Sequence, residues 1–171
     1  MAIADPAILA RDFPISHALL VHDDLMTPVL TQAFGAVHAR QTGLEHDGDS
    51  LTRWSTLYQT ATGAVLLQAV LVIFKTTLPT GFLDRLLGGT QPFGSLLIET
   101  GLVVRVTDRH IFRAGPPGGV HAGAWGRRHR MLRARDDVPV CDVEERLEDE
   151  TTLADLILPS MRDRLARPDQ P

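Results

Sequence analysis

Residues that could do chemistry are present in this chain, but none has the spacing of a common catalytic or metal-binding motif. The seven histidines are scattered, and no His-Glu-x-x-His, Cys-x-x-Cys or Gly-x-Ser-x-Gly string occurs. Residues 88–90 (Gly-Gly-Thr) are not followed by the lysine of a phosphate-binding loop. Cys141 lies within an alternating apolar stretch, which favours a structural role. The sequence therefore predicts neither a metal site nor an activated nucleophile.

Four short strings are more distinctive than any single residue. Residues 24–27 (Asp-x-Met-Thr) open an expected helix, and residues 92–94 (Pro-Phe-Gly) join two short helical segments. Residues 123–128 (Gly-x-Trp-Gly-Arg-Arg) precede a strand, and residues 139–144 form the strand that returns beside it. Each string also has an ordinary structural interpretation: a capped helix, a kinked connection, a surface arginine pair and an acidic strand face.

The elements that must position these strings follow from hydrophobic periodicity and turn residues. Strands are expected over residues 36–40, 53–59, 64–77, 102–112, 125–134 and 138–147. Short helices are expected over residues 5–20 with breaks at two prolines, from 27 to about 35, and over 79–87, 95–100 and 151–165, with Thr27 and Thr151 as the caps. Residues 115–123 have the composition of a flexible loop. Because strands follow one another without regular helical crossovers, we predict an α+β fold, mostly an antiparallel sheet with short helices on one side.

Composition excludes several classes of function. With 171 residues, 44% of them hydrophobic, the chain can form one globular domain with its own core. A formal charge of −4 argues against a nucleic-acid partner. The most apolar run, residues 64–74, falls well short of the ~20 residues of a membrane span. A single cysteine fits a reducing compartment, so we expect a soluble, cytoplasmic protein without a membrane partner.

In order and spacing, the four strings resemble the chorismate pyruvate-lyase family over roughly residues 16–147, most specifically at residues 123–128. The resemblance implies a chorismate-lyase-like domain over residues 1–148, with residues 149–171 as a C-terminal helical extension. It implies a monomer with a buried site that needs no cofactor and no metal. The activity it implies is elimination of pyruvate from chorismate to give 4-hydroxybenzoate.

The resemblance also implies two catalytic residues. The family arginine begins an Arg-x-x-x-Leu string, which matches at Arg53 if the next hairpin turn is two residues longer than usual. Without that insertion, Ser55 occupies the position. The family glutamate follows a proline by five residues, as Glu144 follows Pro139. Residues 155–159 (Asp-Leu-Ile-Leu-Pro) imitate the same ending, but they would break the contiguous hairpin, so Glu144 is preferred.

The predicted substrate-binding residues come from the same strings. The family contributes backbone groups at positions that match Met26 and Phe93, and their neighbours Thr27 and Gly94 complete the cavity wall. The paired arginines of residues 123–128 are expected to have a structural or gating role, with Arg128 close to the substrate.

These residue types suit the reaction that the resemblance implies. A buried arginine such as Arg53 can hold a planar ring carboxylate through two parallel hydrogen bonds. Glu144 would bond the ring hydroxyl or the ether oxygen, either assisting proton transfer or only positioning the substrate. Without the resemblance, Arg53 would be a surface strand residue and Glu144 part of a solvated charge run.

Three other functions stay open. The cavity could serve a lyase or cyclase that acts on another metabolite, or a non-catalytic protein that binds a small molecule. A third alternative is a ligand-sensing regulator domain, but the first 20 residues are too short for an attached helix-turn-helix.

Overall fold

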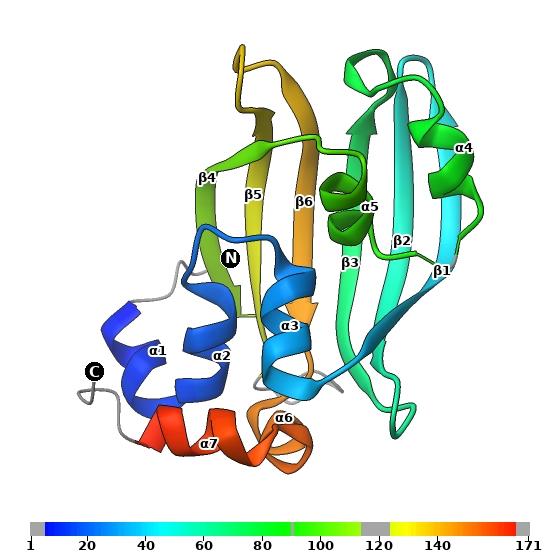
Figure 1. Cartoon of the computed structure of the whole chain (residues 1–171). Coiled ribbons are helices and arrows are strands. Elements are labelled where there is room, and N and C mark those ends of the chain that lie inside the picture. The colour runs from blue at the N-terminus through cyan, green and yellow to red at the C-terminus, as the bar shows by residue number, and fades with distance from the viewer. Residues whose placement is uncertain (1–5, 90, 114–123, 167–171) are drawn as a thin grey trace.

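The computed structural model describes residues 6–89, 91–113 and 124–166, and it confirms the α+β class. One six-stranded sheet has the order β1-β2-β3-β6-β5-β4, and every neighbouring pair of strands is antiparallel (Figure 1). The strands are β1 (Val37–Asp47), β2 (Ser50–Gln59), β3 (Val65–Phe74), β4 (Val104–Arg113), β5 (Trp125–Arg133) and β6 (Pro139–Leu147). The helices are α1 (Pro6–Asp12), α2 (Pro14–Leu20), α3 (Met26–Phe34), α4 (Phe82–Leu87), α5 (Phe93–Glu99), α6 (Glu150–Leu156) and α7 (Pro159–Ala166), with a short 3₁₀ turn, η1 (Lys75–Thr77), after β3.

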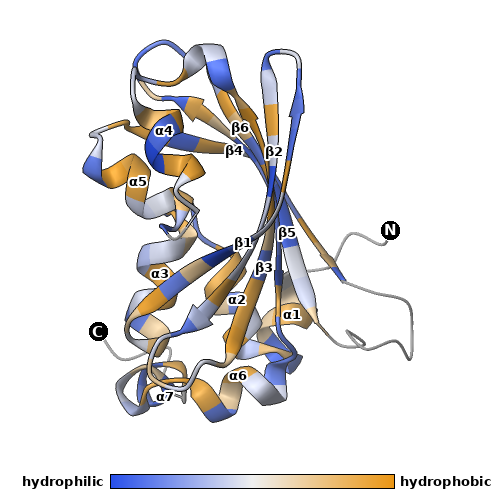
Figure 2. Cartoon of the chain, turned by 90° about the vertical axis from the view of Figure 1, so that its right-hand side faces the viewer, coloured by the Kyte–Doolittle hydropathy of each residue, from blue (hydrophilic) through white to orange (hydrophobic). Residues whose placement is uncertain are grey.

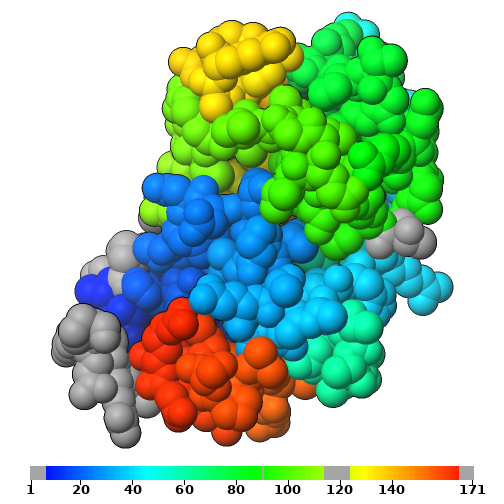
Figure 3. Space-filling model, viewed as in Figure 1, coloured from blue at the N-terminus to red at the C-terminus, as the bar shows by residue number. Residues whose placement is uncertain are grey.

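In the described part of the chain, the helices cover one face of the sheet and leave the other without a helix. Figure 2 shows the sheet nearly edge-on, with α3, α4 and α5 on one side, and in Figure 3 these helices hide the middle of the sheet. We call the covered side the inner face and the other the outer face. Because side chains alternate along a strand, the odd-numbered residues of β2, β5 and most of β6 are buried on the inner face. Leu51, Leu57 and Met131 are examples.

The glycine of the Trp-Gly-Arg string lets strands β4, β5 and β6 approach closely. A Cβ atom on Gly126 would lie 2.5 Å from the backbone oxygen of Glu145 and 2.6 Å from the Phe112 ring. Phe112 is itself buried and lies opposite Gly126 in the register of β4 and β5. The glycine therefore admits an aromatic ring where a larger residue would push the strands apart.

The C-terminal helices are joined to the same core. Leu153 and Ile157 are buried in the main hydrophobic cluster. The carboxylate of Glu150 accepts hydrogen bonds from the backbone N–H groups of Ile15 and Ser16, at 2.7 and 2.9 Å. It thereby satisfies donors at the start of α2 that have no partner within that helix.

Several predicted boundaries differ from the structure. The single helix expected over residues 151–165 is two helices, because Pro159 starts a new one, and the cap is Asp149 instead of Thr151. Helix α3 begins one residue before Thr27, with Leu25 at the cap and no side-chain capping bond. Strand β1 continues to Asp47, seven residues past the end expected at residue 40. The loop predicted over residues 115–123 lies outside the described residues.

Within the described part of the chain, no helix is both long enough and apolar enough to cross a membrane.

Candidate active site

A small cavity lies between the inner face of the sheet and the first turns of α3 and α5. Its volume is about 40 Å³, and its walls are mostly apolar. Four of the predicted substrate-binding residues, Met26, Thr27, Phe93 and Gly94, line it together. The other lining residues are Leu25, Ser55, Leu57, Leu67, Ala69, Leu71, Met131, Val143 and Glu145. The structure thus brings two strings that are more than 60 residues apart to one interior site.

The two covering helices touch each other at Gly94. A Cβ atom there would lie 2.8 Å from Thr27 Oγ1 and 3.3 Å from Thr27 Cβ. Glycine at this position therefore allows the start of α5 to lie against the start of α3. Because neither helix has a side-chain cap, the first backbone N–H groups of each remain without such a partner.

The floor of the cavity carries a polar row across three strands. Ser55 on β2 pairs with Ala69 on β3, and Ala69 pairs with Glu145 on β6. All three residues are buried. The small side chain of Ala69 lies between the Ser55 hydroxyl and the Glu145 carboxylate. The Ser55 hydroxyl has no hydrogen-bond partner among the described residues. A buried hydroxyl without a partner is costly, and it is available to a ligand.

Arg53 lies beside this row, and its whole side chain is buried. It pairs in register with Leu71, which lines the cavity, although Arg53 itself does not. Its guanidinium donates hydrogen bonds to Gln41 Oε1 at 3.3 Å and to the backbone oxygens of Gly89 and Gln91 at 3.4 and 3.2 Å. These are long bonds to neutral acceptors. Of the two positions that the family resemblance left open, Ser55 lines the cavity, whereas Arg53, two residues earlier on the same face of β2, does not.

The charge of Arg53 is not balanced by any carboxylate in the described part of the chain. The ion pairs found there all involve other arginines. Burial lowers the pKa of Arg53 from its ordinary value, but an arginine side chain stays protonated near neutral pH. A buried cation without a counter-ion is expensive, which marks this position as a candidate for binding an anion.

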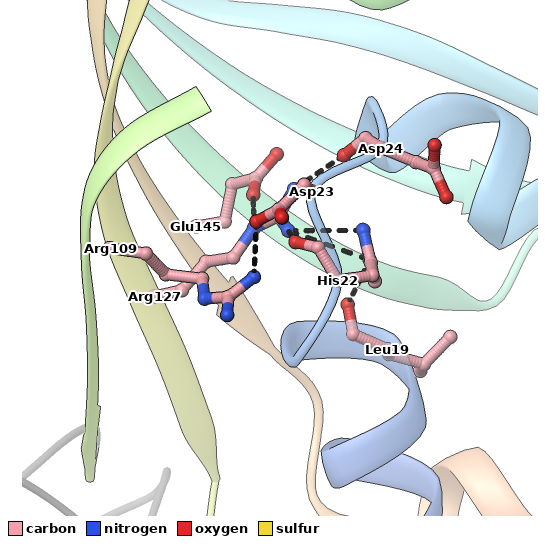
Figure 4. A network of polar contacts seen from close by, with 7 residues as sticks. All are labelled: Leu19, His22, Asp23, Asp24, Arg109, Arg127 and Glu145. Carbon is pink, nitrogen blue, oxygen red and sulfur yellow. Dashed lines mark hydrogen bonds and ion pairs between the residues drawn. The ribbon is translucent and has the colours of Figure 1, made fainter. Parts of the chain in front are cut away.

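A second buried arginine is fully paired and ties the segment before α3 to the sheet (Figure 4). Arg127 Nε donates to Glu145 Oε2 at 2.5 Å, with both side chains buried. Its other nitrogens donate to the backbone oxygens of His22 and Asp24, at 3.2 and 3.5 Å. Arg109 on β4 adds a hydrogen-bonded ion pair to Asp23 at 2.7 Å. Arg127 therefore has a structural role, which is one of the two roles, structural or gating, that sequence analysis proposed for the arginine pair.

Two histidines lie close to this buried pair. Neither ring nitrogen of His129 has a hydrogen-bond partner among the described residues. Burial, with the positive charge of Arg127 second, lowers the pKa of His129 to about 3. Burial and Arg127 also lower the pKa of His22, whose Nε2 lies 2.8 Å from the backbone oxygen of Leu19. A ring with its pKa near 3 is neutral at physiological pH.

The structure does not bring Glu144 and Arg128 to this cavity; instead they line a separate pocket of about 460 Å³. Both lie on the outer face, where Glu144 accepts hydrogen bonds from Arg128 and from Arg146. Burial would raise the pKa of Glu144, but the two arginines outweigh it, and the pKa lies below its ordinary value. Arg128 also lies 5.3 Å from the centre of the Phe112 ring.

The physical reason is the pairing register of β5 with β6. Arg127 pairs with Glu145 and Arg128 pairs with Glu144, so each arginine shares a face with its partner. The register shifts between Met131 and Leu132, close to the hairpin turn. A count from Pro139 therefore does not tell which face a later residue occupies. Alternation from the buried Val143 would have placed Glu145 inside.

Comparison with protein-family models and with curated proteins gives no significant match to this chain. The described residues contain no group of three or more His, Cys, Asp and Glu side chains placed to hold a metal ion.

Proposed function

We propose that this protein is a cofactor-independent lyase that eliminates pyruvate from chorismate to give 4-hydroxybenzoate. The observation that carries the proposal is the unbalanced charge of the interior. Arg53, Arg127 and Glu145 are buried, and only the last two pair with each other. One positive charge is left beside an apolar cavity, as a site for a carboxylate on a ring requires.

In this proposal Arg53 binds the ring carboxylate. Its present acceptors are neutral and distant, at 3.2 to 3.4 Å, so a carboxylate would replace them with shorter, charge-assisted bonds. Two of these acceptors, the backbone oxygens of Gly89 and Gln91, belong to the connection between α4 and α5. A ligand that reaches Arg53 from the cavity would displace this connection.

Glu145 takes the role that sequence analysis gave to Glu144. Its carboxylate lies on the cavity floor and is held by Arg127. It would accept a hydrogen bond from the ring hydroxyl of chorismate. Met26, Thr27, Phe93 and Gly94, which line the cavity together, would contact the second carboxylate, on the enolpyruvyl side chain.

The reaction breaks the bond between the ring carbon and the ether oxygen. The ring also loses the hydrogen from its hydroxyl-bearing carbon and becomes aromatic, while the methylene carbon of the departing enolpyruvate gains a proton and gives pyruvate. Atoms balance without an oxidant or a further reactant. The residues hold the substrate in a reactive geometry, and the apolar wall excludes water from the reacting bonds. In this proposal the protein acts as a cytoplasmic monomer.

A second function is favoured by the size of the cavity. About 40 Å³ holds little more than a water molecule or two, and sites for drug-sized ligands are several times larger. Chorismate would therefore require the starts of α3 and α5 to move apart. A lyase, cyclase or binding protein for a smaller carboxylate would need less movement.

The test is to mix purified protein with chorismate, then follow pyruvate by a coupled enzyme and 4-hydroxybenzoate by chromatography. We expect equal amounts of both products, with kcat/KM about 100-fold lower in Arg53→Met. Arg53→Met should keep or raise the unfolding midpoint, because it removes an unpaired buried charge. The control is Arg130→Ala, which breaks an outer-face pair with Asp142 and should leave turnover unchanged.

Glu145→Gln distinguishes the two possible mechanisms. A loss of about 100-fold or more in kcat would indicate proton transfer by the carboxyl, whereas a loss of about tenfold would indicate positioning alone. If pyruvate forms no faster than it does without protein, the lyase proposal is withdrawn, and the smaller carboxylates become the ligands to screen.

A further inference from the structure

Ser55 is the one cavity-lining residue of the described chain whose buried polar atom has no partner. Its side chain is 4% exposed. The other unpartnered buried atoms belong to Trp125 and His129, and neither residue lines this cavity. A hydroxyl that could have bonded water in the unfolded chain thus faces an apolar cavity alone, and folding does not repay its desolvation. A ligand that forms a hydrogen bond with the Ser55 hydroxyl would compensate for this lost hydration.

The position of Ser55 relative to Arg53 limits which ligand this could be. The two residues face the same side of β2, two positions apart, so their Cα atoms are roughly 7 Å apart along the strand. A ring acid held by its carboxylate at the guanidinium of Arg53 could therefore present a para hydroxyl toward Ser55. Leu71, opposite Arg53, and Ala69, opposite Ser55, give the ring a flat apolar floor.

The position of Ser55 relative to Glu145 supports the same orientation. The two residues lie in one cross-strand row, separated by Ala69, with Cα atoms roughly 10 Å apart. A ring hydroxyl above Ala69 can donate to the carboxylate of Glu145 and accept from Ser55 Oγ. Both groups would then be satisfied by a single ligand oxygen.

We propose that Ser55 is a specificity-determining residue that hydrogen-bonds the hydroxyl para to the carboxylate of a ring ligand held by Arg53. This inference rests on the proposed function and adds the feature of the ligand that the site recognises. The para hydroxyl is present in chorismate and is kept in 4-hydroxybenzoate, because elimination removes only the neighbouring ether. Ser55 therefore binds substrate and product alike.

A contact that is the same before and after the reaction has a distinct kinetic signature. It lowers KM without raising kcat. In Ser55→Ala we expect KM for chorismate to rise about fivefold to tenfold, with kcat unchanged within about twofold. The affinity for 4-hydroxybenzoate should fall by the same factor. A residue with a merely structural role would instead change kcat and KM together.

The experiment compares two ligands and three proteins by calorimetric titration, alongside chorismate turnover. The ligands are 4-hydroxybenzoate and benzoate, which differ only in the para hydroxyl. The proteins are wild type, Ser55→Ala and Thr56→Ala, the last being the next residue on the same strand but on the outer face. We expect wild type and Thr56→Ala to prefer 4-hydroxybenzoate, and Ser55→Ala to lose about fivefold or more of that preference.

The outcomes separate this inference from the proposed function. If pyruvate forms and wild type prefers 4-hydroxybenzoate, but Ser55→Ala keeps the full preference, the role of Ser55 is refuted and the lyase stands. If neither ligand binds wild type and no pyruvate forms, both are refuted together.

Discussion

Two arginine–glutamate pairs lie back to back on the same two strands, and they differ mainly in the face that they occupy. Arg127 and Glu145 face the helices with both side chains buried. One position along each strand, Arg128 and Glu144 face outward, with 49% of the Arg128 side chain exposed. The residue types and strands are the same, yet one pair anchors the cavity floor and the other joins a surface network. Residue type alone therefore does not tell which pair lies at the cavity. The face of the strand on which each pair lies decides it.

The two pairs contribute differently to stability because only the outer pair is accessible to water. The outer arginine can be solvated when its partner is removed, so the pair contributes little to stability. Arg127 and Glu145 are shielded from water, so neither can be solvated when its partner is removed. Each therefore needs the other, because a lone buried charge is strongly destabilising. The inner pair also holds the segment before α3 through the backbone oxygens of His22 and Asp24. Its loss should therefore affect the cavity wall as well as the floor.

The largest expected effect comes from breaking the two pairs in turn. Arg127→Ala should lower the free energy of unfolding by about 3–5 kcal/mol, because it leaves Glu145 buried without a partner. Arg128→Ala should lower it by less than about 1 kcal/mol. Urea unfolding at neutral pH measures both. The double variant Arg127→Met/Glu145→Leu should recover most of the loss, since it removes both charges together. Equal losses in the two single variants would contradict the contrast between the faces.

A smaller effect is expected from pH, because the inner face also carries a neutral histidine. The folded-state pKa of His129 is about 3, below its unfolded value of about 6.5. As pH falls between these values, the unfolded chain binds a proton that the folded chain does not, so stability is lost with acidification. Between pH 7 and pH 4.5 this histidine alone should account for about 2–3 kcal/mol.

The measurement is the free energy of unfolding at both pH values for wild type and His129→Leu. The variant should lose about 2–3 kcal/mol less than wild type over this range. His110, an exposed histidine on the neighbouring strand β4, gives the matched substitution His110→Leu. If His129→Leu and wild type lose the same amount, the imidazole of His129 is not held neutral by burial.

Local periodicity predicted the fold class, while the residues of the site depended on register. That Arg53 is buried on the inner side of β2 followed only from the family resemblance, since without it Arg53 would be a surface strand residue. Pairing across the β5–β6 hairpin decided between Glu144 and Glu145, and one shifted residue near the turn defeated a count along the chain. A register set by cross-strand contacts is not visible in either strand alone.

Other parts of the site depended on contacts between distant segments. That Ser55 is unpartnered and that Arg53 lacks a carboxylate are consequences of what packs around them, which no local pattern encodes. The strings at residues 24–27 and 92–94 were recognisable because each starts a helix. Their meeting over one cavity required the sheet between them.

The smallest expected effect is a change in stability at the contact between α3 and α5, the two helices that meet over the inner face. Gly94 lies within α5, where replacing glycine with alanine ordinarily stabilises a helix by about 0.5–1 kcal/mol. Here the added methyl would lie 2.8 Å from Thr27 Oγ1, which forces the helices apart. We therefore expect Gly94→Ala to destabilise the protein by about 1–2 kcal/mol in urea unfolding, opposite in sign to the helix effect.

Variants at neighbouring positions decide whether the destabilisation by Gly94→Ala comes from the contact between α3 and α5 or from an effect within α5 alone. Ser95→Ala, one residue along α5, adds no bulk toward Thr27 and should change stability by no more than about 0.5 kcal/mol. Thr27→Ala combined with Gly94→Ala removes the atom that the methyl meets, so the double variant should be more stable than the sum of the single effects. A stabilising Gly94→Ala would mean that α5 can move away from α3 without cost. The walls of the cavity of about 40 Å³ could then adopt more than one arrangement.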